Sequence, residues 1–215
     1  MRIAVITGGP IYPEAADLVY GSDRVICADS GFDYCLANNI KPDEVFGDLD
    51  SISSEGKDYL SHSGIPVNMF PSHKDVTDTE ICLEACPEGS EVILICSLTG
   101  RLDHVLTNMG LLLKYKKQGM DITASDGRTD VIPMTGEEKI TIGGLNSEQV
   151  AISLVPFAAD TVKGVTTENL LYPLENAELD PLGSLYVSNE PVEGSDSCSV
   201  SIREGNLLVM ITPKV

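Results

Sequence analysis

The stretch Glu44-Val45-Phe46-Gly47-Asp48-Leu49-Asp50-Ser51 joins a short apolar run to two closely spaced carboxylates. We expect the apolar part to be a buried strand that ends at Gly47. Carboxylates two positions apart in an extended chain point to the same side, so Asp48 and Asp50 would lie close together. Such a pair repels itself unless a cation intervenes, and Mg²⁺ commonly binds one or two carboxylates together with substrate phosphates. The stretch therefore predicts a metal and phosphate site at a strand end, with an acidic turn as the alternative.

Around this stretch, residues 1–133 alternate apolar runs with helical patterns. Alternating strands and helices indicate a mostly parallel sheet covered on both faces, and ligands bind such sheets beyond the carboxyl ends of the strands. Polar groups follow three of the expected strands, so we expect one composite site there. The expected strands are Ile3–Thr7, Val25–Ala28, Val45-Phe46, Val67–Phe70, Val92–Ser97, Ile122–Ala124 and Val131–Ile132. The expected helices are Pro13–Tyr20, Phe32–Asn38, Ser54–Ser61, Thr77–Ala85 and Leu102–Lys117.

From about Met134 the helical periodicity stops and short β-type runs are separated by turn residues. This spacing predicts an all-β sandwich or barrel over residues 134–215, following the α/β domain of residues 1–133. Glu204-Gly205-Asn206 suggests a tight hairpin between the last two strands. The expected strands are Lys139–Ile142, Val150–Val155, Thr161–Thr166, Leu170–Leu174, Ser184–Val187, Ser197–Arg203 and Asn206–Thr212.

Size and composition are those of an ordinary folded protein. The chain has 215 residues, 42% of them hydrophobic and 22% charged. Its formal net charge of −19 argues against nucleic acid as a partner, because phosphate backbones are bound by clusters of Lys and Arg. We expect a cytoplasmic protein, since no signal peptide or membrane-spanning run is recognisable and several of the six cysteines lie in apolar runs, as reduced thiols do.

A second acidic cluster occupies residues 75–80. Thr77 and Glu80 have the spacing of a capping box at a helix start, which is a purely structural role. Asp75 and Asp78 add more acid than a cap requires. We therefore expect at least one of these two carboxylates to take part in a functional site.

A third cluster, Thr99–His104, follows the most apolar strand. Arg101 is suited to clamp phosphate. Asp103 could cap the long helix or bind a metal. His104 could act as an acid or base, although a structural histidine is the commoner outcome. Gly8-Gly9 would allow backbone N–H groups to approach phosphate, but neither a dinucleotide fingerprint nor a Walker A motif is present.

Taken together, these motifs resemble the thiamine pyrophosphokinase family, in order and in spacing. The resemblance rests on these segments: Ala28–Gly31, Gly47–Ser51, Lys74–Asp78, Thr99–His104, Ser153–Pro156, Val165–Thr167 and Ser188–Glu190. It covers nearly the whole chain. It implies an α/β nucleotide domain followed by a β-sandwich, in a homodimer whose active sites are shared between subunits. It also implies transfer of pyrophosphate from ATP to the hydroxyl of thiamine, with Mg²⁺ and with AMP as the second product.

The resemblance also implies roles for individual residues. Asp78 would contact thiamine and orient or deprotonate its hydroxyl. One departure concerns Tyr172, where many members carry a tryptophan; a tyrosine can still stack on a cationic thiazolium ring. The implied catalytic residues are Asp48, Asp50, Asp78 and Arg101. The implied metal ligands are Asp48, Asp50 and Asp75. The implied nucleotide-binding residues are Asp29, Lys74, Asp75, Thr77, Thr99, Gly100 and Asp103. The implied thiamine-binding residues are Asp78, Thr166, Tyr172 and Asn189.

Two other functions fit parts of this pattern. An acid-x-acid motif also holds metal and diphosphate in nucleotide-sugar glycosyltransferases, but that class does not account for the other clusters or for a C-terminal sandwich. The acidic loops could also belong to a metal-binding or nucleotide-binding module without catalytic activity.

Overall fold

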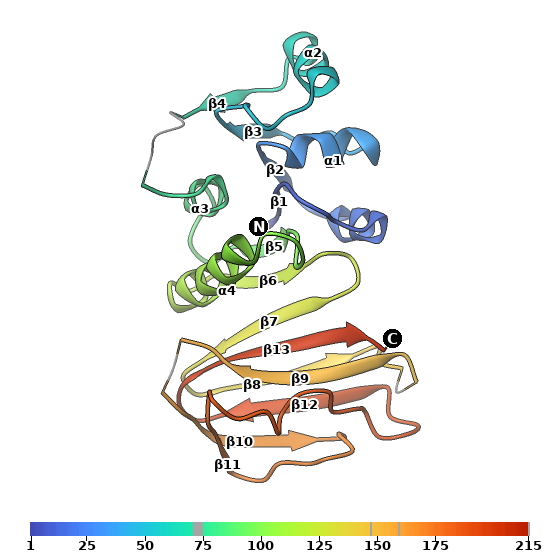
Figure 1. Ribbon diagram of the computed structural model, residues 1–215, viewed down its shortest axis with the longest axis vertical. Helices are drawn as coiled ribbons and strands as arrows, with labels where there is room; N and C mark the ends of the chain where they lie inside the picture. Colours follow the sequence, from blue (N-terminus) through green and yellow to red (C-terminus); the bar gives the residue numbers. More distant parts are fainter. Residues whose placement is uncertain (71–74, 147, 159, 215) are drawn as a thin grey trace. The chain divides into compact units, whose positions relative to one another are not determined.

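The computed structural model describes residues 1–70, 75–146, 148–158 and 160–214. These residues form two compact units, Met1–Arg128 and Thr129–Val215. The first unit is α/β and the second is a β-sandwich, which confirms the expected fold class (Figure 1). Within the described ranges, no helix combines the length and the apolar character that crossing a membrane requires.

The first unit is built on parallel strands in the order β4-β3-β2-β1-β5-β6. Strands β1 and β2 are almost entirely buried, as expected for a sheet covered on both faces. Their residues, with those of α1, form much of the apolar core of this unit. The strands are β1 (Arg2–Ile6), β2 (Arg24–Ala28), β3 (Glu44–Gly47), β4 (Val67–Met69), β5 (Glu91–Ile95) and β6 (Asp121–Ser125).

Helices connect these strands, and their ends follow ordinary capping chemistry. The Ser53 side chain accepts a hydrogen bond from the Gly56 N–H at the start of α2, and left-handed Gly64 ends that helix. The first connection, expected as an α-helix over Pro13–Tyr20, is a 3-10 helix. The helices are η1 (Pro13–Val19), α1 (Gly31–Ala37), α2 (Ser54–Ser63), α3 (Asp78–Glu84) and α4 (Leu102–Lys117).

The strand order changes direction at β1, which lies between β2 and β5. Chain segments leaving the carboxyl ends of β1 and β5 therefore separate, and a crevice forms where they part. Thr7 follows β1, Asp29 follows β2 and Ser97 lies just beyond β5. This topology brings the polar strand ends of the first unit to one place.

The second unit contains two layers of antiparallel strands. One layer has the order β7-β13-β9 and the other β11-β10-β12-β8. Buried side chains from both layers form one apolar core, which makes the unit a sandwich. The strands are β7 (Asp130–Thr135), β8 (Glu138–Gly143), β9 (Val150–Pro156), β10 (Val162–Glu168), β11 (Ala177–Leu179), β12 (Ser197–Ile202) and β13 (Asn206–Pro213).

Four expectations about strands and their pairing are wrong. Leu170–Leu174 and Ser184–Val187 are not strands, and the strand in this region is β11. The turn at Glu204–Asn206 does not close a hairpin, because β12 pairs with β8 and β10 whereas β13 pairs with β7 and β9. The turn instead carries the chain from one layer to the other. The run Val131–Ile132, expected to complete the parallel series, lies in β7, which pairs antiparallel with β13.

The glycine that ends β3 allows the loop after β2 to approach it. Gly47 has φ +138°, and a Cβ added there would lie 1.9 Å from Asp29 Oδ1. We expect Gly47→Ala to lower the free energy of unfolding by about 1–3 kcal/mol, because both the backbone and the Asp29 carboxyl must move. Gly64→Ala is the matched control, since Gly64 is also left-handed but has open space around it. Equal losses for the two variants in urea unfolding would contradict the contact argument.

Candidate active site

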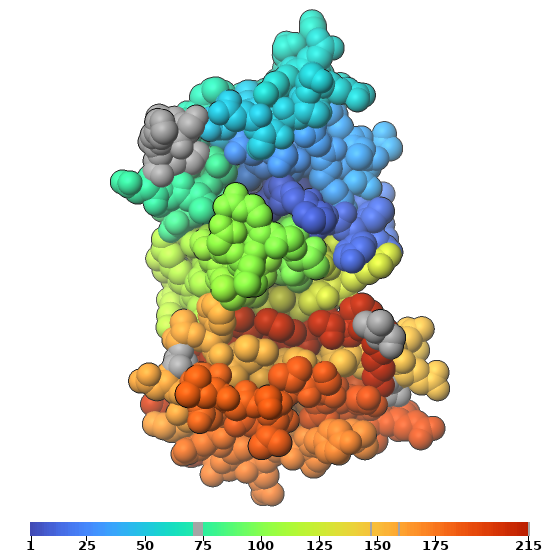
Figure 2. Space-filling model, viewed as in Figure 1, coloured from blue at the N-terminus to red at the C-terminus, as the bar shows by residue number. Residues whose placement is uncertain are grey.

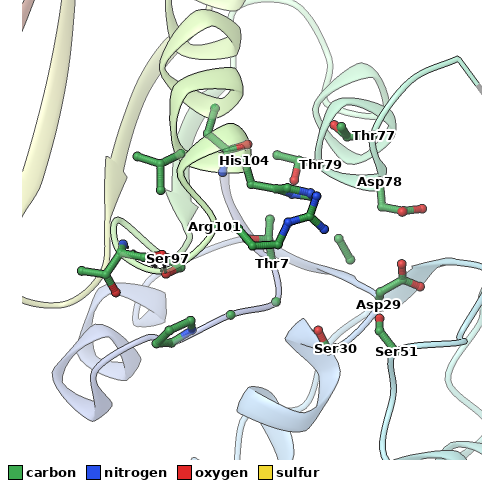
Figure 3. Close-up of a pocket in the computed structure, with 17 residues that line it drawn as sticks. Thr7, Asp29, Ser30, Ser51, Thr77, Asp78, Thr79, Ser97, Arg101 and His104 are labelled. Atoms are coloured by element: carbon green, nitrogen blue, oxygen red, sulfur yellow. Dashed lines mark hydrogen bonds between the residues drawn. The ribbon is translucent and has the colours of Figure 1, made fainter.

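A cavity of about 350 Å³ opens at the carboxyl ends of β1, β2 and β5 (Figure 3). The first turns of α3 and α4 complete its wall. In the space-filling view, the beginning of α4 lies at the surface of this unit beside the N-terminal segment (Figure 2). The cavity is lined by Thr7, Gly8, Gly9, Pro10, Ala28, Asp29, Ser30, Ser51, Thr77, Asp78, Thr79, Ser97, Thr99, Arg101, His104, Val105 and Asn108.

Asp29 is held in an unusual backbone conformation at the end of β2. Its φ is +42°, in the left-handed region that non-glycine residues seldom occupy. Its Oδ1 accepts a hydrogen bond of 3.1 Å from the Leu49 N–H, and its own N–H donates to the Phe46 carbonyl at 2.9 Å. Strand β3 and the loop after it thus hold the Asp29 carboxyl at the cavity wall.

Asp29 and Asp78 form a pair of neighbouring carboxyl groups, and Figure 3 shows them on the same side of the cavity. Burial, followed by the influence of the neighbouring Asp78 side chain, raises the pKa of Asp29 to about 6; the charge of Asp48 adds a smaller effect in the same direction. Two acids so close together share a proton at low pH and attract a cation at neutral pH.

Asp78 owes its position to the helix start that the sequence predicts. The Thr77 Oγ1 accepts a hydrogen bond of 3.2 Å from the Glu80 N–H, which confirms Thr77 as the N-cap of α3. Asp78 is the first residue of the helix, where the helix dipole favours negative charge. Glu80, expected to complete the capping box, has its carboxylate in an ion pair with Lys114 on α4 at 2.5 Å.

The loop Asp48–Asp50 is not extended, so the premise for placing its two carboxylates on one side is wrong. Leu49 has φ +64°, which turns the chain between the two acids. The Asp50 N–H donates to Asp48 Oδ1 at 2.9 Å, as in a turn stabilised by an aspartate side chain. Asp48 is half-buried near Asp29, whereas Asp50 is exposed.

Arg101 provides positive charge beside the carboxylate pair. In Figure 3 its side chain extends from the start of α4 across the cavity toward the side that carries Asp78. A forked ion pair with Asp103 holds the guanidinium, with Nε–Oδ1 at 3.2 Å and Nη2–Oδ2 at 2.6 Å. This hydrogen-bonded pair lowers the pKa of Asp103 to about 2. His104, which follows in the same turn, also lines the cavity.

Two glycines after β1 let Ser30 and Ser97 pack against the backbone that lines the cavity. A Cβ on Gly8 would lie 2.0 Å from Ser30 Oγ, and one on Gly9 would lie 2.8 Å from Ser97 Cβ. Side chains at these positions would therefore collide with the opposite wall. Backbone N–H groups and nearby hydroxyls in such a confined place are typical of phosphate sites.

The structure brings some of the expected site residues together and not others. Asp29, Thr77, Asp78, Thr99 and Arg101 line one cavity. Asp48, Asp50, Asp75, Gly100 and Asp103 are not among its lining residues, and Lys74 lies outside the described residues. Sequence reasoning missed the following lining residues: Thr7, Ser30, Ser51, Thr79, Val105 and Asn108. Their helical or strand-end positions were the only signal that could have indicated them.

The donor set suits a hard cation that is completed by phosphate. Over the residues that the structure describes, no cluster of three or more His, Cys, Asp or Glu side chains has metal-binding geometry. Mg²⁺ needs no such protein cage, since it is usually held by one or two carboxylates together with substrate phosphates and water. Burial and then the charge of Asp78 raise the pKa of Asp29, and a bound cation would relieve the repulsion between the two carboxylates.

In the second unit, the side chains of Thr166 and Asn189 hold loops. Thr166 Oγ1 accepts a hydrogen bond of 3.0 Å from the Asn176 N–H. Buried Asn189 accepts from the Tyr172 N–H at 3.1 Å and donates to the Tyr172 carbonyl at 2.8 Å. These bonds fix the backbone of Tyr172 and leave its side chain 67% exposed. An exposed aromatic ring on a fixed backbone is suited to stacking on a ligand.

Comparison with known sequences identifies relatives for both units. The family "Thiamin pyrophosphokinase, catalytic domain" matches residues 15–124, and the family "Thiamin pyrophosphokinase, vitamin B1 binding domain" matches residues 137–207. The thiamine pyrophosphokinase of Bacillus subtilis (strain 168) is 28% identical over 214 residues, covering 97% of each chain. Thiamine pyrophosphokinase 1 of Oryza sativa subsp. japonica is 27% identical, covering 86% of this chain and 79% of its own.

Solved structures agree with these matches. The thiamine pyrophosphokinase of Bacillus subtilis superposes with a TM-score of 0.84 at 25% identity and covers 100% of both chains. That of Geobacillus thermodenitrificans gives a TM-score of 0.81 at 27% identity and covers 100% of this chain and 98% of its own. The Candida albicans enzyme, at 14% identity, shares the fold with a TM-score of 0.82, covering 99% of this chain and 89% of its own.

Proposed function

The chain belongs to the thiamine pyrophosphokinase family, and we infer that it transfers pyrophosphate from ATP to the hydroxyl of thiamine, giving thiamine diphosphate and AMP. The observation that supports this most directly is a carboxylate pair and an arginine around one glycine-lined cavity in the unit matched by the catalytic family. The comparisons give no support to a glycosyltransferase or to a non-catalytic binding module. We further propose that residues 1–133 bind ATP and that residues 134–215 bind thiamine.

Phosphate binding is assigned to the glycine-lined side of the cavity. Gly8 and Gly9 line the cavity, and Arg101 supplies a planar guanidinium that can bind two phosphate oxygens at once. Asp103 holds that guanidinium in place until phosphate arrives. Thr77, Thr99 and Gly100, with Lys74 nearby in the sequence, complete the proposed nucleotide-binding segment.

We propose Mg²⁺ as the metal, held by Asp29, Asp78 and Asp48 together with phosphate oxygens. Asp29 and Asp78 are neighbouring carboxyls, and both Asp78 and Asp48 are close enough to raise the pKa of Asp29. When bound, the ion would neutralise phosphate charge and orient the phosphate being transferred. Asp50 is exposed and its N–H binds Asp48, so we assign Asp50 to orienting Asp48. Asp75 is exposed and does not line the cavity, so we leave it out of the proposed metal site.

In the transfer, the protein side chains position the two substrates and remove the proton of the thiamine hydroxyl. Asp78 accepts the proton of the thiamine hydroxyl as its oxygen bonds to the β-phosphorus of ATP, and the bond from that phosphorus to the α-phosphate oxygen breaks, releasing AMP. Tyr172 stacks on the cationic thiazolium ring, with Thr166 and Asn189 fixing the loops around it.

Product analysis tests the proposed reaction. The full-length protein is incubated with ATP, Mg²⁺ and thiamine, and nucleotides are separated by chromatography. AMP formed in equal amount to thiamine diphosphate is the expected result. ADP as the thiamine-dependent product would show phosphate transfer in place of pyrophosphate transfer. Turnover that does not depend on thiamine would exclude thiamine as the acceptor.

Arg101→Ala is expected to raise the KM for ATP by about tenfold or more, because a charge-assisted, two-point contact with phosphate is lost. Arg101→Lys keeps the charge and loses the fork, so it should recover only part of the affinity. Lys117→Ala, which removes an exposed cation from the far end of α4, is the control. Initial rates over a range of ATP concentrations check this. A normal KM in Arg101→Ala would remove Arg101 from the phosphate site.

We propose a homodimer with active sites shared between subunits, in which the carboxylates of one chain work with Tyr172 of the other. Asp78→Ala and Tyr172→Ala proteins should each have little activity, and a mixture of the two should recover part of it. Subunit exchange is verified with mass-tagged chains. Exchange without recovery would contradict a shared site.

The free state of all six cysteines supports a cytoplasmic location.

A further inference from the structure

Two buried cysteines lie under the loop that carries Asp29. Cys27 in β2 and Cys35 in α1 have their sulfur atoms 3.0 Å apart, in hydrogen-bonding contact, and neither side chain is exposed. A disulfide bond is about 2.05 Å long, so the two sulfurs need to approach by only about 1 Å to bond. Cys82 of α3 also lies near enough to Cys27 to interact with it electrostatically. The proposed reaction makes no use of these thiols.

The residues between the two cysteines are part of the cavity wall. Ala28, Asp29 and Ser30 lie between Cys27 and Cys35 and all three line the cavity. Cys82 is one helical turn after Asp78 on α3, so the same small group of thiols underlies both members of the carboxylate pair. A covalent bond formed here would act directly on the segment that positions Asp29.

The segment Ala28–Gly31 is packed so closely that it cannot move without displacing its neighbours. A Cβ at Gly31 would lie 2.3 Å from the Ile6 carbonyl oxygen, so the beginning of α1 is in close contact with β1. Ser30 is in similarly close contact with Gly8, on the opposite side of the cavity. A shift of α1 toward Cys27 therefore changes the cavity itself.

We propose that Cys27 and Cys35 are a reversible oxidation site, at which a hydroperoxide forms a disulfide that lowers activity. In the first step one sulfur attacks the peroxide, the O–O bond breaks, and the sulfur becomes a sulfenic acid as the reduced oxygen leaves as water or an alcohol. In the second step the other thiol displaces the sulfenic oxygen as water, and the S–S bond forms. Each hydroperoxide oxidises one pair of thiols, and a dithiol reductant reverses the reaction.

Burial sets how the site is reached. With no exposed sulfur in the resting fold, reaction must follow a local opening of α1, a helix of only seven residues. We therefore expect ATP, which occupies the cavity, to slow oxidation by holding the Asp29 loop closed. This part rests on the proposed function, whereas formation of the bond does not.

Peptide mapping tests the site in the full-length protein. Protein is treated with hydrogen peroxide, remaining thiols are alkylated under denaturing conditions, and digests are analysed by mass spectrometry. A Cys27–Cys35 linked peptide that accumulates in parallel with loss of activity is the expected result, with activity falling about tenfold or more and returning after a dithiol reductant. Cys35→Ala and Cys27→Ala proteins should keep their activity in peroxide; either one serves if the other does not fold.

One control variant and two results that would contradict the proposal complete the experiment. Cys198→Ala, which removes a buried thiol from the second unit, is the control and should be inactivated like the wild type. Absence of the linked peptide while Cys96 and Cys198 are oxidised would exclude the site. Full linkage with unchanged activity would exclude its effect on the reaction. A wild-type protein that makes no AMP before treatment fails the proposed function, and the mapping result then still decides whether the disulfide forms.

Discussion

Asp78→Asn is expected to lower kcat/KM for AMP formation by about 10²–10⁴, because the variant cannot accept the proton of the thiamine hydroxyl. The amide also removes one carboxylate from the pair with Asp29, which weakens the proposed hold on Mg²⁺. The fold should survive, since Thr77, and not Asp78, caps α3. AMP formation at saturating Mg²⁺, together with urea unfolding of the same preparations, measures both effects.

Asp75→Asn is the matched control, because Asp75 is also an acid just before α3 but is exposed and does not line the cavity. Its activity should stay within a few-fold of the wild type, as for most surface substitutions. If Asp75→Asn loses as much activity as Asp78→Asn, the metal site includes Asp75, as the resemblance to the family implied. If Asp78→Asn keeps activity within tenfold, Asp78 is not the base.

The location of the site was predictable from the sequence because parallel strands end at a common edge. Asp29, Arg101 and Asp78 were each expected from a separate local pattern, and topology alone places strand ends together. The contact between Asp29 and Asp78 was not predictable in this way. It depends on the left-handed turn at Asp29 and on the packing of α3 over the sheet, neither of which is encoded in a local motif.

The stretch Asp48–Asp50 shows how an argument from spacing can fail. Side chains two apart share a face only while the chain is extended. Leu49 is left-handed, so the strand has already ended when the acids appear. The acidic turn, which was the alternative interpretation, describes the local geometry of Asp50 correctly. We keep the metal proposal for Asp48, which lies near Asp29.

In the sandwich, short patterns predicted turns and strands better than they predicted partners. The expected turn is present at Gly205, which has φ +109°. The chain passes close to the start of β10 there: a Cβ at Gly205 would lie 3.0 Å from the Thr161 carbonyl oxygen. A tight turn between two apolar runs looks the same in sequence whether it closes a hairpin or changes layer. The failed strands contain Leu171, Tyr172, Leu185 and Val187, which are all more than half exposed. Leu170, Leu174 and Tyr186 of the same runs pack in or against the core, so these segments contribute to the core as loops.

Asp29→Asn is expected to make the ligand-free protein more stable at pH 8 while lowering its activity by about 10² or more. The folded pKa of Asp29 is about 6, above the usual value of 3.8. The folded state therefore binds this proton more tightly than the unfolded state, so the stability that it contributes is fully present below about pH 4 and is lost as the pH rises through 6. Because the carboxyl is only half-buried, solvent screening reduces the cost to about 1 kcal/mol at pH 8.

Urea unfolding at pH 4 and pH 8, with divalent cations removed, tests this sign. Asp121→Asn, at an exposed acid that begins β6, controls for the change in net charge. The advantage of Asp29→Asn over that control should be present at pH 8 and absent at pH 4. An advantage of equal size at both pH values would mean that the substitution acts through packing or hydrogen bonding and not through the charge. Loss of stability in Asp29→Asn at pH 8 would mean that the hydrogen bond from the Leu49 N–H outweighs the repulsion from Asp78. The carboxylate pair would then not destabilise the fold in the absence of a cation.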